Sequence, residues 1–180
     1  MLSTSSAATV SSSPIRRCAR ALSSLGVAVP LYKQLELLKR NLTAVATAIT
    51  AGVIGSVVSV YVMSMIFKLE HVHYVSLLPK SITTAIGMGV SEEAGGIVTM
   101  TIVSIIITGI LGNIIADGWF KLIGIKEPIA KGLALGTSAH AIGTAKALEL
   151  GEVEGAMSSL SIAVAGLMTV VSVPIMSGLI

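Results

Sequence analysis

Three long stretches of the sequence contain no aspartate, glutamate, lysine or arginine: residues 41–67, 94–116 and 155–180. A helix needs about 20 mainly apolar residues to cross the hydrocarbon layer of a membrane, so each stretch is long enough. Buried helices of soluble proteins, the alternative interpretation, rarely run past about 20 residues. Because backbone groups in lipid are satisfied only within helices or closed barrels, the sequence predicts an all-α integral membrane protein with three long transmembrane helices.

Composition excludes several other classes of protein. Of the 180 residues, 53% are hydrophobic and 12% are charged, about half the charged share of a typical soluble domain, and disorder needs the opposite balance. Cys18 is the single cysteine, which excludes a disulfide scaffold. Residues 1–40 carry six basic residues and one acidic residue, whereas the rest of the chain carries six and eight. Since nucleic-acid binding requires a basic folded face, we expect no nucleic-acid partner.

Two segments between the spans, 77–93 and 128–154, have a mixed character. Each has an apolar middle of about a dozen residues and is rich in glycine, serine and threonine. An apolar stretch of 10–14 residues is more typical of a re-entrant or interfacial segment than of a full crossing. SITTAIG at 81–87 and TSAHAIG at 137–143 share AIG, and acidic residues and a long span follow each. We therefore expect two re-entrant or broken-helix segments in a weak internal repeat.

Basic residues beside the spans predict the topology. Lys39 and Arg40 precede the first span and place the N-terminus in the cytoplasm. If both broken segments are re-entrant, the lysines between the second and third spans also lie in the cytoplasm; if both segments cross, these lysines lie outside. The re-entrant arrangement obeys the positive-inside rule better, and its two hairpins enter from opposite faces and meet near the midplane. Charged residues around Trp119, between 117 and 127, predict an interfacial turn.

Interrupted hydrophobic segments in matching positions of two halves are typical of transporter substrate sites. A broken helix exposes backbone N–H groups and a positive dipole end, which favour an anion. Hydroxyl, lysine and histidine side chains surround both breaks and suit a small carboxylate substrate. The candidate substrate-binding residues are Lys80, Ser81, Thr83, Thr84, Thr137, Ser138, His140 and Thr144.

Several of these residues have a second interpretation. His140 is either a proton relay or ligand group, or a neutral histidine that holds the hairpins together. Lys80 faces the substrate or extends to the interface, and Lys146 is expected at the interface. His71 and His73 alternate in a short loop with no third ligand near them in sequence. We find no nucleophile–base pair, phosphate loop or metal spacing, and so expect neither an enzyme nor a cofactor or bound metal.

Five motifs after residue 26 resemble a known family. They are VAVPLYKQ (27–34), SLLPKSITTAIG (76–87), GG (95–96), TGILG (108–112) and IAKGLALGTSAHAIGTAKALELGEVEGAMSSL (129–160). With these motifs the chain resembles the LrgB/CidB family of bacterial antiholin-like membrane proteins, to which one half of the plastid glycolate/glycerate translocator is related.

The resemblance implies a multi-pass membrane protein that works with an LrgA/CidA-type membrane partner or as a homo-oligomer. It also implies movement of small monocarboxylates such as pyruvate, glycolate or glycerate, and control of murein hydrolase export and autolysis. Our main hypothesis is a monocarboxylate transporter or transporter subunit in a bacterial plasma membrane, with the plastid inner envelope as the alternative location. The alternative function is a non-transporting antiholin-like regulator.

A stripe of small residues in the first span offers that regulator a packing surface. Gly52, Gly55, Ser56 and Ser59 lie three or four residues apart or adjacent, and such stripes let helices approach closely. The regulator would pack with its partner through stripes of this kind.

The N-terminus departs from the family pattern, because members usually carry further hydrophobic spans before the VAVPLYKQ-like motif. Residues 1–26 are instead rich in serine and arginine and contain no acidic residue. This composition is typical of an organellar transit peptide; a truncated or misassigned reading frame and a disordered arm are the alternatives. We divide the chain into a polar arm at 1–26, expected to be disordered, and a membrane domain at 27–180.

Overall fold

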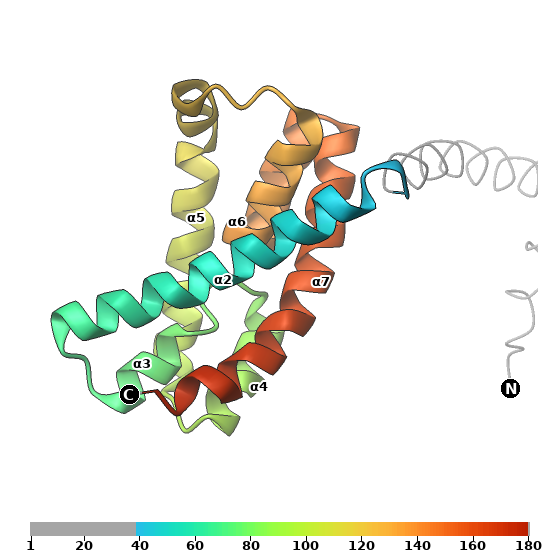
Figure 1. The fold of residues 1–180 in the computed structure, drawn as a ribbon. Helices are drawn as coiled ribbons and strands as arrows, with labels where there is room; N and C mark the ends of the chain where they lie inside the picture. Colours follow the sequence, from blue (N-terminus) through green and yellow to red (C-terminus); the bar gives the residue numbers. More distant parts are fainter. Residues whose placement is uncertain (1–38, 180) are drawn as a thin grey trace, which may run out of the picture. The chain divides into compact units, whose positions relative to one another are not determined.

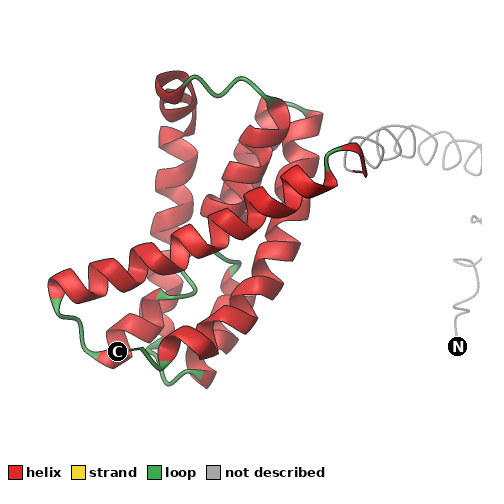
Figure 2. Cartoon of the chain, viewed as in Figure 1, coloured by secondary structure: helices red, strands yellow, loops and turns green. Residues whose placement is uncertain are grey.

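A computed structural model describes residues 39–179, so the predicted arm at 1–26 lies outside the described residues. One compact unit begins at Leu42, and every regular element in it is a helix, which confirms the predicted all-α fold (Figure 1, Figure 2). The helices are α2 (Leu42–Phe67), α3 (His71–Leu77), α4 (Thr84–Glu93), α5 (Val98–Ile123), α6 (Pro128–Leu150) and α7 (Glu152–Ser177).

Helices α2, α5 and α7 are long and apolar enough to cross a membrane. Each has 26 residues, or about 39 Å at 1.5 Å per residue, against a hydrocarbon layer of about 30 Å. Large apolar side chains point outward from them, with Ile114 70% exposed and Leu167 71% exposed. A soluble protein rarely leaves so much apolar surface uncovered. The prediction of three long spans is confirmed.

The interfacial turn predicted between 117 and 127 is wrong in its first half. Helix α5 continues to Ile123, so Asp117 and Trp119 lie on a helix. The chain leaves the helix only at Gly124, which adopts a left-handed conformation with φ 78°, a common way to end a helix. No proline precedes Gly124 in this stretch, and Gly118 alone costs only about 1 kcal/mol within a helix. Isolated charges near an interface do not stop a helix either.

The first broken segment enters and returns. Helices α3 and α4 flank a break at residues 78–83. The hydroxyl oxygen of Thr101, on α5, lies 2.8 Å from the carbonyl oxygen of Ser76 and 2.7 Å from Oγ of Ser91. Because Ser76 is on α3 and Ser91 on α4, both ends of the segment lie at one level of α5. The segment is a re-entrant hairpin, as predicted.

The second broken segment folds in the same way inside α6. His140 has φ 44° and ψ −132°, which interrupts the helix. A Cβ added to Gly143 would lie 2.6 Å from the carbonyl oxygen of Leu135, whereas eight residues of straight helix span about 12 Å. Leu135 and Ala147 also share one buried cluster. Helix α6 therefore consists of two antiparallel arms, 128–139 and 141–150, with His140 at the tip.

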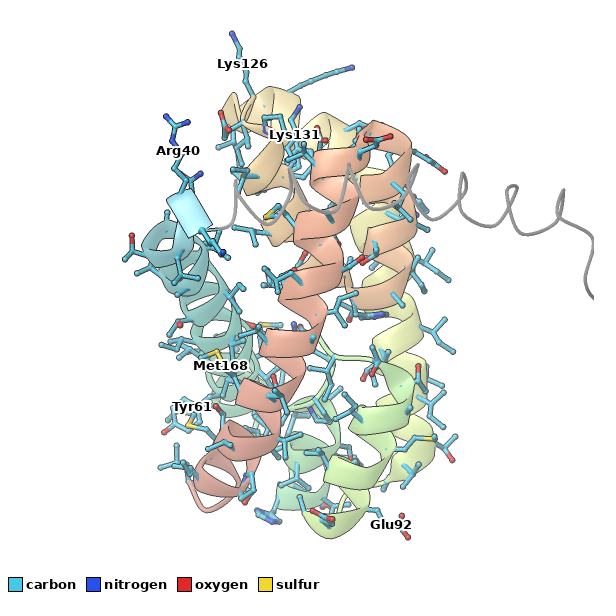
Figure 3. The ribbon with its side chains drawn as sticks, turned by 90° about the vertical axis from the view of Figure 1, so that its right-hand side faces the viewer. Arg40, Tyr61, Glu92, Lys126, Lys131 and Met168 are labelled. Atoms are coloured by element: carbon cyan, nitrogen blue, oxygen red, sulfur yellow. The ribbon has the colours of Figure 1, made fainter. Side chains whose placement is uncertain are left out.

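The two hairpins occupy opposite ends of the unit. The second hairpin lies beside the C-terminal part of α5, and α3 and α4 lie near the end of α7 (Figure 1). Lys126 and Lys131 lie at one end and Glu92 at the other (Figure 3). The arrangement agrees with two hairpins that enter from opposite faces of a membrane.

Candidate functional site

Both hairpins contact the same stretch of α2, near its middle. Ser81 Oγ, in the first break, lies 2.7 Å from Ser56 Oγ. One helical turn earlier, a Cβ on Gly52 would lie 2.9 Å from Cβ of Thr137, in the first arm of α6. Residues four apart on a helix lie about 6 Å apart on one face. On α2, the contact with the break of the first hairpin and the contact with the first arm of α6 therefore lie one helical turn apart.

Both hairpins also meet Ile105, in the first third of α5. His140 Nε2 lies 2.9 Å from the carbonyl oxygen of Ile105. The Ile105 side chain lies against Gly87, on α4 of the first hairpin. The two hairpins therefore come together at two places, near the middle of α2 and at Ile105 of α5.

Lys80 is a partly buried ammonium group in the first break. Its Nζ lies 3.4 Å from Ser81 Oγ and 3.5 Å from Ser56 Oγ. Within residues 39–179, no carboxylate forms an ion pair with it. A charge removed from water is costly unless a counter-charge or strong hydrogen bonds compensate it, and two long hydroxyl contacts compensate little. Lys80, Ser56 and Ser81, which we call the Lys80 cluster, form an electropositive position suited to an anion.

His140 is almost fully buried, at 3% exposure. A carbonyl oxygen can only accept, so Nε2 of His140 carries a hydrogen and donates it to Ile105. Gly109 lies against the ring, because a Cβ there would be 2.7 Å from Cε1 of His140. The hydrogen bond connects the second hairpin to α5, which agrees with the structural interpretation of His140. A role of His140 as a proton relay stays a prediction.

The other predicted residues of the second hairpin have local partners. Thr137 donates to the carbonyl of Leu133 at 2.8 Å, and exposed Ser138 donates to the carbonyl of Ala134 at 2.6 Å. Thr144 Oγ1 lies 2.7 Å from Ser158 Oγ on α7. Thr144 therefore faces α7 and not the first hairpin.

Thr83 and Thr84 lie where α4 begins. Thr83 is the N-cap residue without a side-chain cap bond, and Thr84 is the first helical residue. Ser56 was absent from the predicted site, since the sequence placed it in the small-residue stripe of the first span. Its position one helical turn after Gly52 was the only sequence feature that singled it out. No feature of the neighbouring sequence indicates that Ser56 lies close to Lys80.

A cavity of about 700 Å³ lies between α2, α5 and the first arm of α6. Thr108, Thr137 and Ser138 line one end, Trp119 and Phe120 line the other, and most of the remaining lining is apolar. We expected a hydroxyl-lined pocket between both hairpins. This cavity is bordered by one hairpin, and its lining does not include Lys80 or His140.

Metal binding finds no support in the described part of the chain. Among residues 39–179, no group of three histidine, cysteine, aspartate or glutamate side chains gathers closely enough to hold an ion. His71 and His73 lie on α3, which places them on a short helix where a loop was expected.

Comparison with known proteins identifies the family. The LrgB-like family matches residues 22–179. The chain belongs to the LrgB-like family. Its relatives include the antiholin-like protein LrgB of Bacillus mycoides, 41% identical over 150 residues, and those of Bacillus cereus and Bacillus anthracis, each 40% identical. No solved structure matches the chain.

The match to LrgB proteins confirms the family expected from the motifs. It begins at residue 22, so the end of the predicted arm falls inside the matched region. The aligned region covers 83% of this chain and 65% of each of these relatives. The chain thus spans about two thirds of the length of the LrgB proteins that it resembles. Its spans and its bacterial LrgB relatives together support a bacterial membrane protein.

Proposed function

We propose that this LrgB-like chain acts in a bacterial membrane as an antiholin-like regulator of murein hydrolase export and autolysis. The observation that supports this function is about 40% identity to proteins named antiholin-like protein LrgB. We expect the chain to act there with an LrgA/CidA-type membrane partner or with a second copy of itself.

Expression in a Bacillus strain that lacks its own LrgB tests this regulatory function. We expect the chain to slow detergent-induced lysis toward the rate of the parent strain, because an antiholin restrains the release of murein hydrolases. The measurement is optical density over time, with the amount of membrane-inserted protein determined in parallel. Lysis at the rate of the empty vector, with the protein present in the membrane, would contradict the proposal.

One geometric observation favours a second candidate function, transport of small monocarboxylates. The Lys80 cluster places an ammonium group without a carboxylate partner near the middle of α2. An ionisable side chain at such depth is expected to serve a ligand or an ion path. Helix α4 begins at Thr84, just beyond the cluster, and its first N–H groups have no partner within the helix. Ammonium, hydroxyls and a helix N-terminus all favour a carboxylate.

Substitution of Lys80 by methionine tests the transport function directly. In proteoliposomes that contain the chain, with and without an LrgA/CidA-type partner, we expect the initial rate of labelled pyruvate uptake to fall roughly tenfold or more. The reason is that a hydrogen bond to a charged group contributes about 1.5–3 kcal/mol. Ser56→Ala should lower the rate less. Ser59→Ala is the matched control, because the Ser59 hydroxyl bonds within its own helix.

The outcomes separate the two functions. If the wild type takes up pyruvate and Lys80→Met takes it up at the same rate, the Lys80 cluster is not the transport site. A lack of uptake by the wild type, with or without the partner, would refute transport and leave the antiholin-like function. Protein insertion is compared between variants, so that a loss of uptake is not confused with a loss of protein.

A further inference from the structure

The cavity between α2, α5 and α6 is an apolar groove with the length of one membrane leaflet. Its wall on α5 runs from Thr108 to Phe120, about 18 Å at 1.5 Å per residue. Half of the hydrocarbon layer measures about 15 Å. Leu111 and Ile115 line the groove and are 52% and 55% exposed. A small carboxylate gains nothing from such a wall, because its charge would be desolvated without a partner.

A second hollow of about 370 Å³ adjoins the groove, and Phe120 lines both. Lys121, Lys126 and Lys131 line it, together with Asp117. Lys126 and Lys131 lie at the same end of the unit (Figure 3). None of the three lysines has an ion-pair partner in the described part of the chain.

The acidic groups nearby neutralise these lysines only in part. Asp117 Oδ2 lies 2.9 Å from Nζ of Lys146, and Glu149 Oε2 lies 3.4 Å from the same nitrogen. Glu154 is buried, with its carboxylate against Gly151. Glu127 is exposed in the connection after α5 but does not line the hollow. The lining of the hollow, with three lysines and one aspartate, therefore has a net charge of +2.

We propose that the groove and the hollow together bind one anionic phospholipid. An acyl chain fills the groove beside Trp119, and the headgroup phosphate lies among Lys121, Lys126 and Lys131. The acyl chain makes van der Waals contacts with apolar side chains of the groove that otherwise have no partner atoms on that side. Basic pockets at the ends of membrane helices attract anionic headgroups.

The groove suits an acyl chain better than a protein helix. A helix with side chains is about 10 Å across. A single acyl chain is thinner and has one charged end, which matches an apolar groove beside a basic hollow. The apolar groove and the basic hollow beside it together favour the lipid over a second copy of the chain.

Trp119 provides the test, because it lines the groove and is the only tryptophan in the sequence. The purified chain is placed in phosphatidylcholine vesicles that contain a small fraction of lipid with a brominated acyl chain. We expect brominated phosphatidylglycerol to quench Trp119 fluorescence more than brominated phosphatidylcholine does. Lys126→Gln and Lys131→Gln should each lower the relative association constant of the anionic lipid about fivefold.

Lys68→Gln is the matched control. It removes the same charge from an exposed lysine between α2 and α3 and should leave the lipid preference unchanged. Equal quenching by the two lipids, or a preference that survives Lys126→Gln combined with Lys131→Gln, would overturn the proposal. Loss of the preference on adding millimolar inorganic phosphate would show that the hollow binds free phosphate. Lack of quenching by either lipid, with a cross-linked dimer, would show that a second copy covers the groove.

Discussion

Substitution of Gly136 by alanine is expected to lower the free energy of unfolding by about 3 kcal/mol or more. Gly136 lies in the first arm of α6, where an added methyl group would overlap Oγ of Ser161 and the carbonyl oxygen of Ser158 on α7. The Ser161 hydroxyl can rotate away, but the Ser158 carbonyl belongs to the helix backbone and cannot. The arm would have to move off α7, and the hairpin would lose its main packing surface.

The measurement is unfolding of the purified protein in mixed micelles by added dodecyl sulfate, followed by helicity. Gly55→Ala is the matched control, because a Cβ at Gly55 meets nothing within 4 Å. That variant should be as stable as the wild type or more stable by up to about 1 kcal/mol. Equal stability of the two variants would mean that α6 does not press against α7.

At the tip of the same hairpin, His140→Ala is expected to destabilise the protein more than His140→Gly does. Both variants lose the hydrogen bond to Ile105 and leave space where the ring packed against Gly109. They differ in the backbone, because His140 has φ 44° and ψ −132°, a conformation that glycine adopts far more readily than alanine. Backbone strain of this kind costs about 1–3 kcal/mol, which the glycine variant releases and the alanine variant keeps.

Unfolding in mixed micelles measures this difference as well, and we expect the glycine variant to be more stable by at least about 1 kcal/mol. Both variants lack the ring and differ only in the Cβ methyl group, so the comparison isolates the cost of the positive φ at this position. An alanine variant as stable as the glycine variant would show that the tip relaxes to an ordinary conformation once the ring is gone.

The hydrogen bond to Ile105 explains why a side chain is needed at position 140 in spite of the strain. A glycine would form the turn without strain, yet it could not reach Ile105. The ring therefore links the second hairpin to α5 at the level where Gly87 of the first hairpin also meets Ile105. Substitutions at His140 thus change the position of the hairpin as well as any chemistry of its ring.

Local composition by itself determined the class of this protein. Three charge-free stretches predicted α2, α5 and α7, and the clusters of glycine, serine and threonine predicted a break within each of 77–93 and 128–154. The structure places these breaks at residues 78–83 and at His140. These features were predictable because the length of a span and the breaking of a helix depend on residues close together in the sequence. The sequence analysis placed the end of α5 too early. Charged residues occur both in turns at the membrane interface and in helices that extend through it, so their presence alone does not locate the end of a helix.

Only the tertiary structure decided which side chains the two breaks meet. Ser56 joins Lys80 from another helix, 24 residues away, and His140 meets a backbone oxygen 35 residues away. No local pattern encodes such a pair, because the packing of several helices sets its distance. The groove beside Trp119 is likewise made by three helices, and its apolar lining follows from which faces of α2, α5 and α6 meet. Membrane insertion follows from composition, whereas the ligand contacts follow from how the hairpins pack.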